Sequence, residues 1–236
     1  GASSRISSAD TAAPAAPTIS GVIEDTGGSD SDGKDILNWV RGDQSKESET
    51  GLRIRNKILG DIINSDPFFI GSTENFGYTT LPGTEGSTYS DFINTQSGKL
   101  DRRNMLYVGG NDGLLHGFDA QTGKEIFGFI PLSVYENLAA LTDPDYDHLY
   151  YVDGSPRAVD AYISSSWKTV LVGSTGAGGR SVFALDVTDP DAMGPGKFLW
   201  EFSTDSADSD KLGVAMSNPV IARLKAGDTG VTIGTA

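Results

Sequence analysis

The sequence predicts an all-β protein built from the four-stranded blades of a β-propeller, present as a partial ring with one or two short helical insertions. Of its 236 residues, 30 are Gly and 10 are Pro, a composition typical of closely spaced turns. About ten short stretches with strand character follow one another from residue 54 onward. Two regions repeat one pattern, which indicates a repeat architecture.

The expected strands are short and are separated by turn residues. In chain order they are DIINSDPFFIGS, NMLYVGG, GLLHGFDA, EIFGFIP, HLYYVDG, RAVDAYIS, KTVLVGS, SVFALDV, FLWEFST and NPVIARL. Strands of about five residues in such a series favour an all-β architecture over a parallel sheet with crossover helices.

The repeat is clearest between residues 106–129 and 170–202, which begin about 64 residues apart. Both consist of an apolar strand, a Gly-rich turn, a strand that ends in Asp, a polar turn and an aromatic strand. The two strand-ending residues are Asp119 and Asp186, and we expect each to accept N–H groups from the turn that follows it. A single blade cannot bury its sheet faces alone, so several blades must stack.

A tether precedes this pattern and two short helices interrupt it. Residues 1–24 are rich in Ala, Ser and Pro and predict a linker or flexible arm, which leaves residues 25–236 for the partial propeller. Apolar residues between Ile36 and Val40 share one face of a predicted helix of about three turns. A second helix is predicted near Ser133, which has capping-box spacing to Glu136.

Charge and composition exclude several kinds of function. The formal net charge of −14 opposes binding to a phosphate backbone, so we expect no nucleic-acid partner. No apolar run approaches the roughly 18 residues of a membrane span. The absence of Cys removes disulfides, thiolate metal ligands and a cysteine nucleophile. Because the chain opens with Gly1 and shows no signal segment, we expect a mature or excised part of a longer protein.

Few residues suggest catalysis. Asp153 and Asp160 could be drawn as an acid–base pair, but a turn at Asp153 and a strand-end cap at Asp160 explain them more simply. His116 and His148 are the only histidines of the sequence, and neither has a second His at metal-ligand spacing. We expect both histidines to be structural.

An acidic, Gly-rich stretch between residues 25 and 35 is predicted to form a loop. Asp30, Asp32 and Asp35 place three carboxylates within six residues around Gly33, the oxygen-rich arrangement that Ca²⁺ requires. The stretch lacks the Glu that completes an EF-hand loop, and a solvated acidic turn is the alternative. The sequence therefore predicts a calcium site without excluding a plain surface turn.

The tripeptide Arg41-Gly42-Asp43 follows closely, and it has two interpretations. One is functional and depends on the family resemblance given below. The simpler interpretation is structural, because Gly42 suits the left-handed position that ends a helix after Val40.

The blade motif resembles that of the pyrroloquinoline-quinone-type propellers. Its residues are Gly110, Asp112, Gly113, Leu115, Asp119, Ala120, Thr122, Gly123 and Lys124. Around it stand LNWVRGD, RNKILGDIINSDPFFIG, GFIPLSVYENLAAL, HLYYVDGSPRAVDAYI and WKTVLVGSTGAGGRSVFALDVTDP. In this order they resemble the start of the C-terminal propeller of the PilY family of type IV pilus tip-associated proteins, over residues 36 to about 224. Family members usually continue into further blades, so we expect about half of a ring here.

The resemblance implies a non-enzymatic propeller that is displayed outside the bacterial cell at the pilus tip and supports pilus assembly, retraction control or adhesion. Implied partners are pilin or minor pilins, a host-surface receptor, and the remaining blades from the parent or another chain. The resemblance also implies calcium binding by Asp-rich loops, and integrin binding by RGD in some members. No other cofactor is expected.

Two other functions stay open. The chain could be a pilus-independent propeller module that only binds a protein partner, or a fragment of a quinone-dependent oxidoreductase. The enzyme would need a full ring, Trp residues that face the cofactor, and an Asp base beside a calcium ion. Half a ring cannot enclose the cofactor, so we expect no enzymatic activity.

Overall fold

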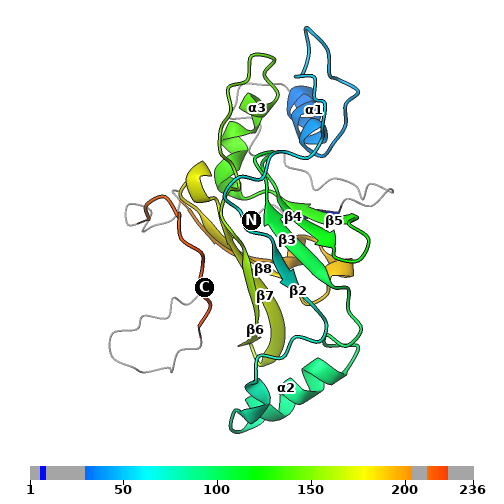
Figure 1. Cartoon of the computed structure of the whole chain (residues 1–236), viewed down its shortest axis with the longest axis vertical. Helices are drawn as coiled ribbons and strands as arrows, with labels where there is room; N and C mark the ends of the chain where they lie inside the picture. The colour runs from blue at the N-terminus through cyan, green and yellow to red at the C-terminus, as the bar shows by residue number, and fades with distance from the viewer. Residues whose placement is uncertain (1–5, 9–29, 204–211, 223–236) are drawn as a thin grey trace.

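Two antiparallel sheets carry the fold (Figure 1). The computed structural model describes residues 6–8, 30–203 and 212–222. The first sheet has the order β1-β5-β4-β3-β2 and the second the order β6-β7-β8-β9. The strands are β1 Ile6–Ser8, β2 Phe68–Ile70, β3 Met105–Gly109, β4 Leu115–Asp119, β5 Glu125–Phe129, β6 Arg157–Ile163, β7 Ser166–Ser174, β8 Val182–Asp186 and β9 Phe198–Phe202.

The helices are short and lie at the two ends of the sheets. In Figure 1, α1 and α3 lie at one end and α2 at the other. The α-helices are α1 Asp30–Val40, α2 Thr84–Asn94 and α3 Leu138–Leu141, and the 3₁₀ turns are η2 Tyr78–Thr80, η3 Leu132–Asn137, η4 Gly176–Gly178, η5 Pro190–Ala192 and η6 Pro195–Lys197. No helix among the described residues is long and apolar enough to cross a membrane.

The two sheets are consecutive blades of one repeat, as the sequence predicts. Strands β2 to β5 form the first blade and β6 to β9 the second. The register between the third and fourth strand shifts at the same place in each blade, between Gly117 and Phe118 in one and between Ala184 and Leu185 in the other. The described residues therefore form part of a propeller and not a closed ring.

The aspartates that end the third strand of each blade do what the repeat predicts. Asp119 Oδ1 accepts the N–H groups of Gln121 and Thr122 at 2.8 and 2.9 Å. Asp186 Oδ1 accepts the N–H of Thr188 at 3.1 Å. The N–H groups of Thr122 and Gln121, together with the Arg103 guanidinium beside Asp119, lower the pKa of Asp119 to about 2.

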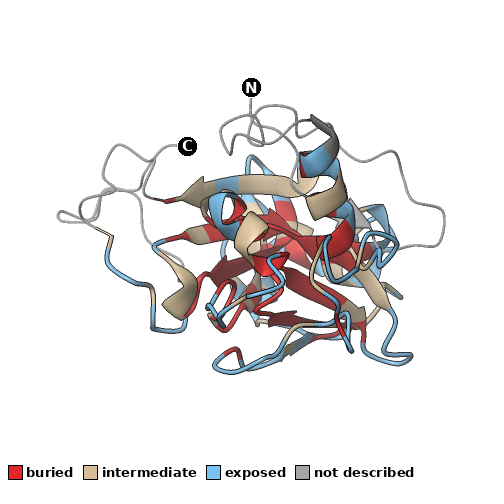
Figure 2. Cartoon of the chain, turned by 90° about the horizontal axis from the view of Figure 1, so that it is seen from above, coloured by how far each residue is buried: buried red, intermediate tan, exposed pale blue. Residues whose placement is uncertain are grey.

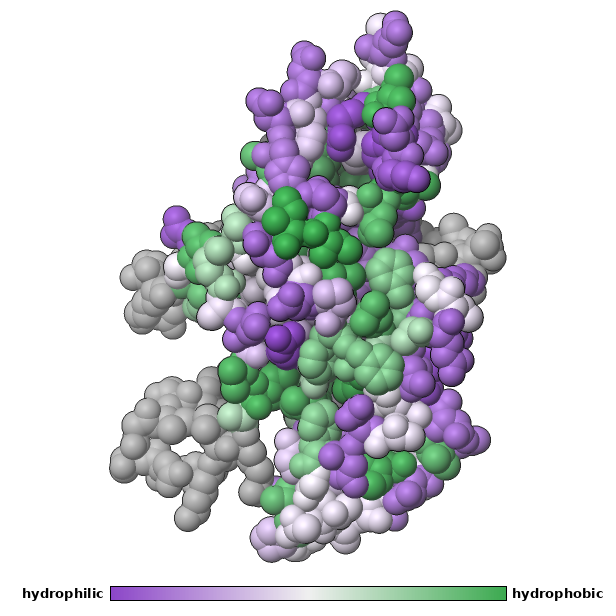
Figure 3. Space-filling view, viewed as in Figure 1, coloured by the Kyte–Doolittle hydropathy of each residue, from purple (hydrophilic) through white to green (hydrophobic). Residues whose placement is uncertain are grey.

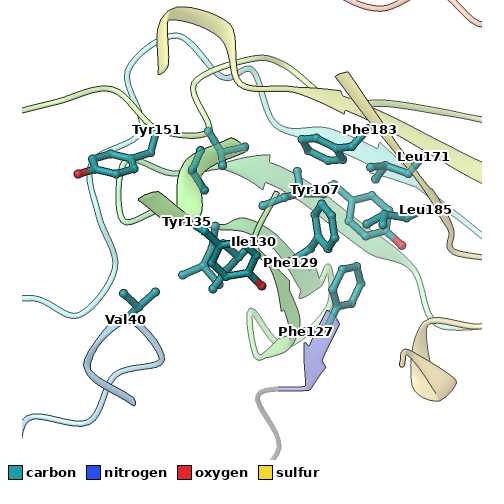
Figure 4. Packing of buried hydrophobic residues seen from close by; sticks show 14 of the residues in the cluster. Val40, Tyr107, Phe127, Phe129, Ile130, Tyr135, Tyr151, Leu171, Phe183 and Leu185 are labelled. Atoms are coloured by element: carbon teal, nitrogen blue, oxygen red, sulfur yellow. The ribbon is translucent and has the colours of Figure 1, made fainter. Parts of the chain in front are cut away.

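The main core lies between the two blades (Figure 4). Tyr107 and Phe129 of the first blade point toward Phe183 and Leu185 of the second, and the Phe129 and Phe183 ring centroids are 4.9 Å apart. Apolar residues of α1 and α3 close one end of this core. Figure 2 shows the buried residues at the centre of the molecule, with the exposed ones around them.

Helix α2 is absent from the sequence-based prediction, and it covers a second, aromatic cluster. Tyr89 and Phe92 of α2 pack against Trp167 of β7. The Tyr89 and Trp167 centroids are 4.5 Å apart, and the Trp167 indole N–H donates to the Glu85 carbonyl oxygen at 3.1 Å. Polar residues such as Thr84 and Ser87 dilute the apolar pattern of this helix, so its contacts to β7 decide its structure.

Two expected strands are wrong. Residues 148–154 and the described part of 218–224 form no strand. The first of these segments links the blades, and Tyr151 and Val152 are nevertheless fully buried there. Their apolar character reflects burial against both blades, which periodicity cannot distinguish from a buried strand.

The predicted capping box at Ser133 is also wrong. This segment begins as the 3₁₀ turn η3 and becomes α-helical only at Leu138. The Ser133 hydroxyl is buried without a hydrogen-bond partner among the described residues. Instead, the Glu201 carboxylate in β9 accepts the N–H groups of Leu132 and Ser133 at 2.7 and 3.0 Å. A long-range partner thus does what the local motif was expected to do.

Three residues of the predicted arm belong to a sheet. Strand β1 pairs antiparallel with β5, with Ile6 opposite Phe129 and Ser8 opposite Phe127. The rest of the predicted arm, 1–5 and 9–24, lies outside the described residues.

Candidate functional site

An irregular segment, residues 53–66, crosses the front of the molecule in Figure 1 beneath α1 and α3 and joins α1 to the first blade. We call it the crossing segment. It contains no helix or strand, and its polar groups bond to distant parts of the chain. The candidate site is built on this segment.

The first half of the crossing segment is held by α1, α3 and the β3–β4 turn. Arg53 N donates to the Thr142 carbonyl oxygen at 2.8 Å, and Arg53 Nε donates to that of Leu141 at 2.7 Å. Further along, Gly60 N donates to Asp112 Oδ2 at 2.7 Å. A Cβ at residue 60 would lie 2.5 Å from Asp112 N, so this close approach requires Gly.

The second half is held by the linker that leads into the second blade. Asn64 donates to both carboxylate oxygens of Asp153, from its backbone N at 3.1 Å and its side chain at 2.7 Å. Ser65 Oγ donates to the Gly154 carbonyl oxygen at 3.0 Å and accepts Gly109 N at 2.9 Å. The crossing segment therefore bonds to the first blade and to the linker that leads into the second.

The apolar side chains of the crossing segment point outward. Ile54, Ile58, Leu59, Ile62 and Ile63 are between 40% and 60% exposed. We call these five residues the apolar ridge. Figure 3 shows apolar side chains gathered where the crossing segment lies in Figure 1. Polar bonds hold the backbone of the crossing segment in place, and the five side chains of the ridge are not part of the buried core.

A pocket of about 340 Å³ opens beside this ridge. Its lining comes from α1, the crossing segment, the β3–β4 turn and the segment around α3: Trp39, Arg53–Asp61, Asn111, Asp112, Leu141, Tyr146 and His148. Three of these lining residues are Arg53, Arg55 and Lys57, so the pocket is locally basic in a strongly acidic chain. We call it the basic pocket.

A stacked Trp–Arg pair lies in the wall of the basic pocket. The Arg55 guanidinium carbon is 3.6 Å from the Trp39 ring centroid, and Arg55 Nε donates to Glu47 Oε1 at 2.7 Å. Burial alone would raise the pKa of Glu47, but the hydrogen bonds from Arg55 and Gln44 outweigh it and lower that pKa. Arg55 Nη1 is buried and has no hydrogen-bond partner among the described residues.

The other charges of the basic pocket do not balance. Arg53 and Lys57 take part in no ion pair between described residues, although Arg53 lies over the Tyr146 ring at 4.5 Å. The acidic lining residue Asp61 already accepts from His148 at 2.9 Å. Burial would raise the pKa of Asp61, but hydrogen bonds from Asn111 and His148 lower it. Arg53 and Lys57 are thus the two lining cations that have no carboxylate partner among the described residues.

His116 is clamped between two carboxylates behind this site. Its Nε2 lies 3.0 Å from Asp112 Oδ1 and its Nδ1 lies 2.7 Å from Glu125 Oε1. Burial alone would lower the pKa of His116, but Asp112 and Glu125 raise it to about 10. A protonated imidazole with both N–H groups engaged has no lone pair for general-base catalysis. The ion pair instead orients Asp112, which holds Gly60.

Asp153 and Asp160 bind different partners and do not form a pair. The strand-end cap expected at Asp160 is wrong. Asp153 binds Asn64, as described above. Asp160 is buried within β6, where its Oδ2 accepts from Lys99 Nζ and Tyr89 at 2.5 and 2.8 Å. Thr169 donates to its other oxygen at 2.7 Å. This buried cluster ties α2 and the segment after it to the second blade.

The acidic residues expected to form a calcium loop lie in the first half of α1 instead. Asp30 is the first residue of the helix, and its side chain lies outside the described part. Asp32 is exposed, and Asp35 Oδ2 lies 3.5 Å from Lys46 Nζ. No group of three His, Asp or Glu side chains within the described residues is arranged to hold a metal. Because Ca²⁺ takes six to eight oxygen ligands, the described residues do not complete a site, and calcium stays a prediction.

The RGD tripeptide forms the C-terminal cap of α1. Gly42 has φ +105, its N donates to the Trp39 carbonyl oxygen at 2.9 Å, and Asp43 N donates to that of Asn38 at 2.9 Å. This is a Schellman motif, as the structural interpretation predicts. Hydrogen bonds from Ser45 lower the pKa of the exposed Asp43. Adhesion through Arg41-Gly42-Asp43 stays a prediction.

The basic pocket was not among the sites predicted from the sequence. The alternation of basic and apolar residues at 53–58, "RIRNKI", is a local signal for it. The packing of Arg55 on Trp39, however, depends on the path of the chain after α1.

The described residues form two blades with a matching bulge and a shared aromatic core but no closed ring, which defines a partial β-propeller. The family model described as "PilY1 beta-propeller domain" matches residues 59–236. The chain therefore belongs to the PilY1 β-propeller family.

Relatives of known name agree with this assignment. The chain is 44% identical over 208 residues to the type IV pilus biogenesis factor PilY1 of Pseudomonas aeruginosa strain PAK, covering 87% of this chain and 17% of that protein. It is 44% identical over 201 residues to a PilY1 homolog of Xylella fastidiosa, covering 84% of this chain and 16% of that protein. The chain thus spans less than a fifth of these relatives.

A solved structure shows the same fold. The crystal structure of the Pseudomonas aeruginosa PilY1 C-terminal domain superposes with a TM-score of 0.51 at 43% sequence identity. The match covers 66% of this chain and 29% of that domain. The match thus extends over less than a third of that domain.

Proposed function

We propose that this chain is the first part of the propeller of a type IV pilus biogenesis factor and acts without catalysis, through binding. The observation that carries the proposal is the 44% identity over 87% of the chain to a protein of that name. The clamped, protonated His116 and the structural engagement of Asp153 and Asp160 support a binding role.

The proposed place of action is outside the cell at the pilus, with pilin or minor pilins as partners. Adhesion to a host surface through Arg41-Gly42-Asp43 belongs to the same proposal, supported by the exposed Asp43 at the turn after α1. Calcium modulation is proposed at the start of α1, where a bound ion would need oxygen donors beyond Asp32 and Asp35.

The test replaces the matching 208 residues of Pseudomonas aeruginosa PilY1 with this chain, in a strain that lacks its own PilY1. We expect the chimera to restore surface pili, measured by shearing and immunoblotting, and twitching motility. A second chimera that carries Gly60→Ala, which removes the close approach to Asp112, serves as the matched control for propeller integrity.

Restored pili with the first chimera and fewer with the second would support the proposal. A stable, exported first chimera without surface pili would contradict it and favour a pilus-independent binding module. Pull-down of minor pilins by the first chimera distinguishes a direct contact from an indirect effect.

A further inference from the structure

The five apolar side chains of the ridge are exposed to solvent, and no contact in the core requires them to be apolar. The neighbours of the ridge in sequence, Gly60, Asn64 and Ser65, are fixed by hydrogen bonds to the first blade and to the linker before the second. Those bonds hold five large apolar side chains along one edge in solvent. Contiguous exposed apolar surface on a folded protein typically marks a contact for another molecule.

The basic pocket beside the ridge offers cationic groups that have no anionic partner among the described residues. Arg53 and Lys57 are outside every ion pair described, and the Arg55 Nη1 donor is unpartnered although the Arg55 side chain is only 5% exposed. The acidic lining residues, Asp61 and Asp112, already accept hydrogen bonds from within the protein. An incoming carboxylate could pair with Arg53 and Lys57, while the two lining carboxylates are already engaged by donors within the protein.

The size and charge of the site narrow the class of ligand. A volume of about 340 Å³ lies at the lower end of the roughly 300–1,000 Å³ range of ligand pockets, which suits one or two side chains. The net charge of −14 opposes a polyanion, while one or a few carboxylates can be accommodated by local charge. The ridge continues past the pocket to Ile62 and Ile63, so the complementary surface is longer than a small molecule.

We propose that the basic pocket binds an Asp or Glu side chain of an extended segment of a partner protein, and that apolar residues beside that carboxylate lie on the apolar ridge. The carboxylate pairs with Lys57 and Arg53 at the pocket, and Trp39 with its stacked Arg55 forms the wall against which it rests. This inference goes beyond the proposed function and does not depend on a role in pili.

The test measures binding of a fluorescein-labelled peptide, acetyl-Leu-Glu-Leu-Asp-Leu-Glu-Leu-amide, to the full chain by fluorescence anisotropy. We expect saturable binding that weakens at least tenfold with Lys57→Glu and at least fivefold with Ile58→Ser. Both residues are exposed, so both variants should keep their thermal unfolding midpoint, checked by circular dichroism. Replacing the three peptide carboxylates with amides should weaken binding at least tenfold.

The matched control is Lys124→Glu, the same charge reversal at an exposed residue in the β4–β5 turn, at the opposite end of β4 from the β3–β4 turn that lines the pocket. We expect its affinity to stay within twofold of the wild type. If Lys124→Glu weakened peptide binding as much as Lys57→Glu does, the change in net charge alone would explain the effect, and the proposal would be overturned. Equal binding of the amide peptide, or competition by succinate at the same concentration as the peptide, would overturn it as well.

Discussion

Removing the Glu201 carboxylate should destabilise the contact between the second blade and η3. The carboxylate accepts two N–H groups from the first turn of η3, those of Leu132 and Ser133, and the hydroxyl of Ser181 at 2.9 Å. In Glu201→Ala, all three donors lose this acceptor. Because η3 follows β5 directly, the change loosens the junction between the blades.

The magnitude follows from these three bonds. A hydrogen bond to a charged group contributes about 1.5–3 kcal/mol, and water can replace part of it because Glu201 is only half-buried. We therefore expect Glu201→Ala to lower the free energy of unfolding by about 2–4 kcal/mol. Glu201→Gln keeps one acceptor oxygen and should cost about half as much. Ser133→Ala should change stability by less than about 0.5 kcal/mol, since it removes a buried hydroxyl without a partner.

The assay is urea unfolding at pH 7 followed by far-ultraviolet circular dichroism, with the slope against urea compared among the three variants. A loss of about 1 kcal/mol in Ser133→Ala would restore the local capping box as the stabilising motif. A Glu201→Ala variant within about 0.5 kcal/mol of the wild type would refute the long-range cap.

Four further predictions concern other parts of the molecule. Because the pKa of His116 is raised from 6.5 to about 10, its ion pairs stabilise the fold fully below about pH 6.5 and lose that effect as the pH rises to 10. His116→Gln should flatten this decline in urea unfolding. Gly60→Ala should cost about 1–3 kcal/mol through its clash with Asp112, and its thermal midpoint should fall. Calcium should protect the α1 region from proteolysis in the wild type but not in Asp32→Ala. Trp200 of the edge strand β9 is 40% exposed, and a blade needs a neighbour to cover its sheet face, so the chain should self-associate and its melting temperature should rise with concentration.

Each of these four has a result that contradicts it. If the free energy of unfolding changed with pH in the same way in wild type and His116→Gln, a group other than His116 would cause the decline. An unchanged midpoint in Gly60→Ala would mean that the crossing segment shifts freely. No calcium heat at millimolar concentration in isothermal titration, or equal binding by Asp32→Ala, would leave α1 with a solvated acidic start. A concentration-independent, reversible melt of a monomer would show that two blades suffice.

The sequence predicts the blades well because their signals are local. The strand pattern, and the turn after each of Asp119 and Asp186, depend on residues within a few positions of one another. The Schellman cap at Gly42 is similarly local, and the structure confirms it.

What the sequence does not predict depends on contacts between distant residues. Helix α2 is stabilised by Trp167, which lies more than seventy positions away, and the start of η3 is capped by Glu201 from another blade. Asp160 has the sequence context of a surface cap, yet the fold encloses it with Lys99. The basic pocket needs Trp39 and Arg55 to meet, which only the path of the chain after α1 brings about.

The bonds of the crossing segment also determine how the domain responds to tension. Gly60 is bonded to Asp112 in the first blade, and Asn64 and Ser65 are bonded to Asp153 and Gly154 before the second. A pulling force applied at α1 is shared by these bonds before it reaches β2. Breaking these bonds would lengthen the chain between α1 and the first blade while the sheets of both blades stay folded.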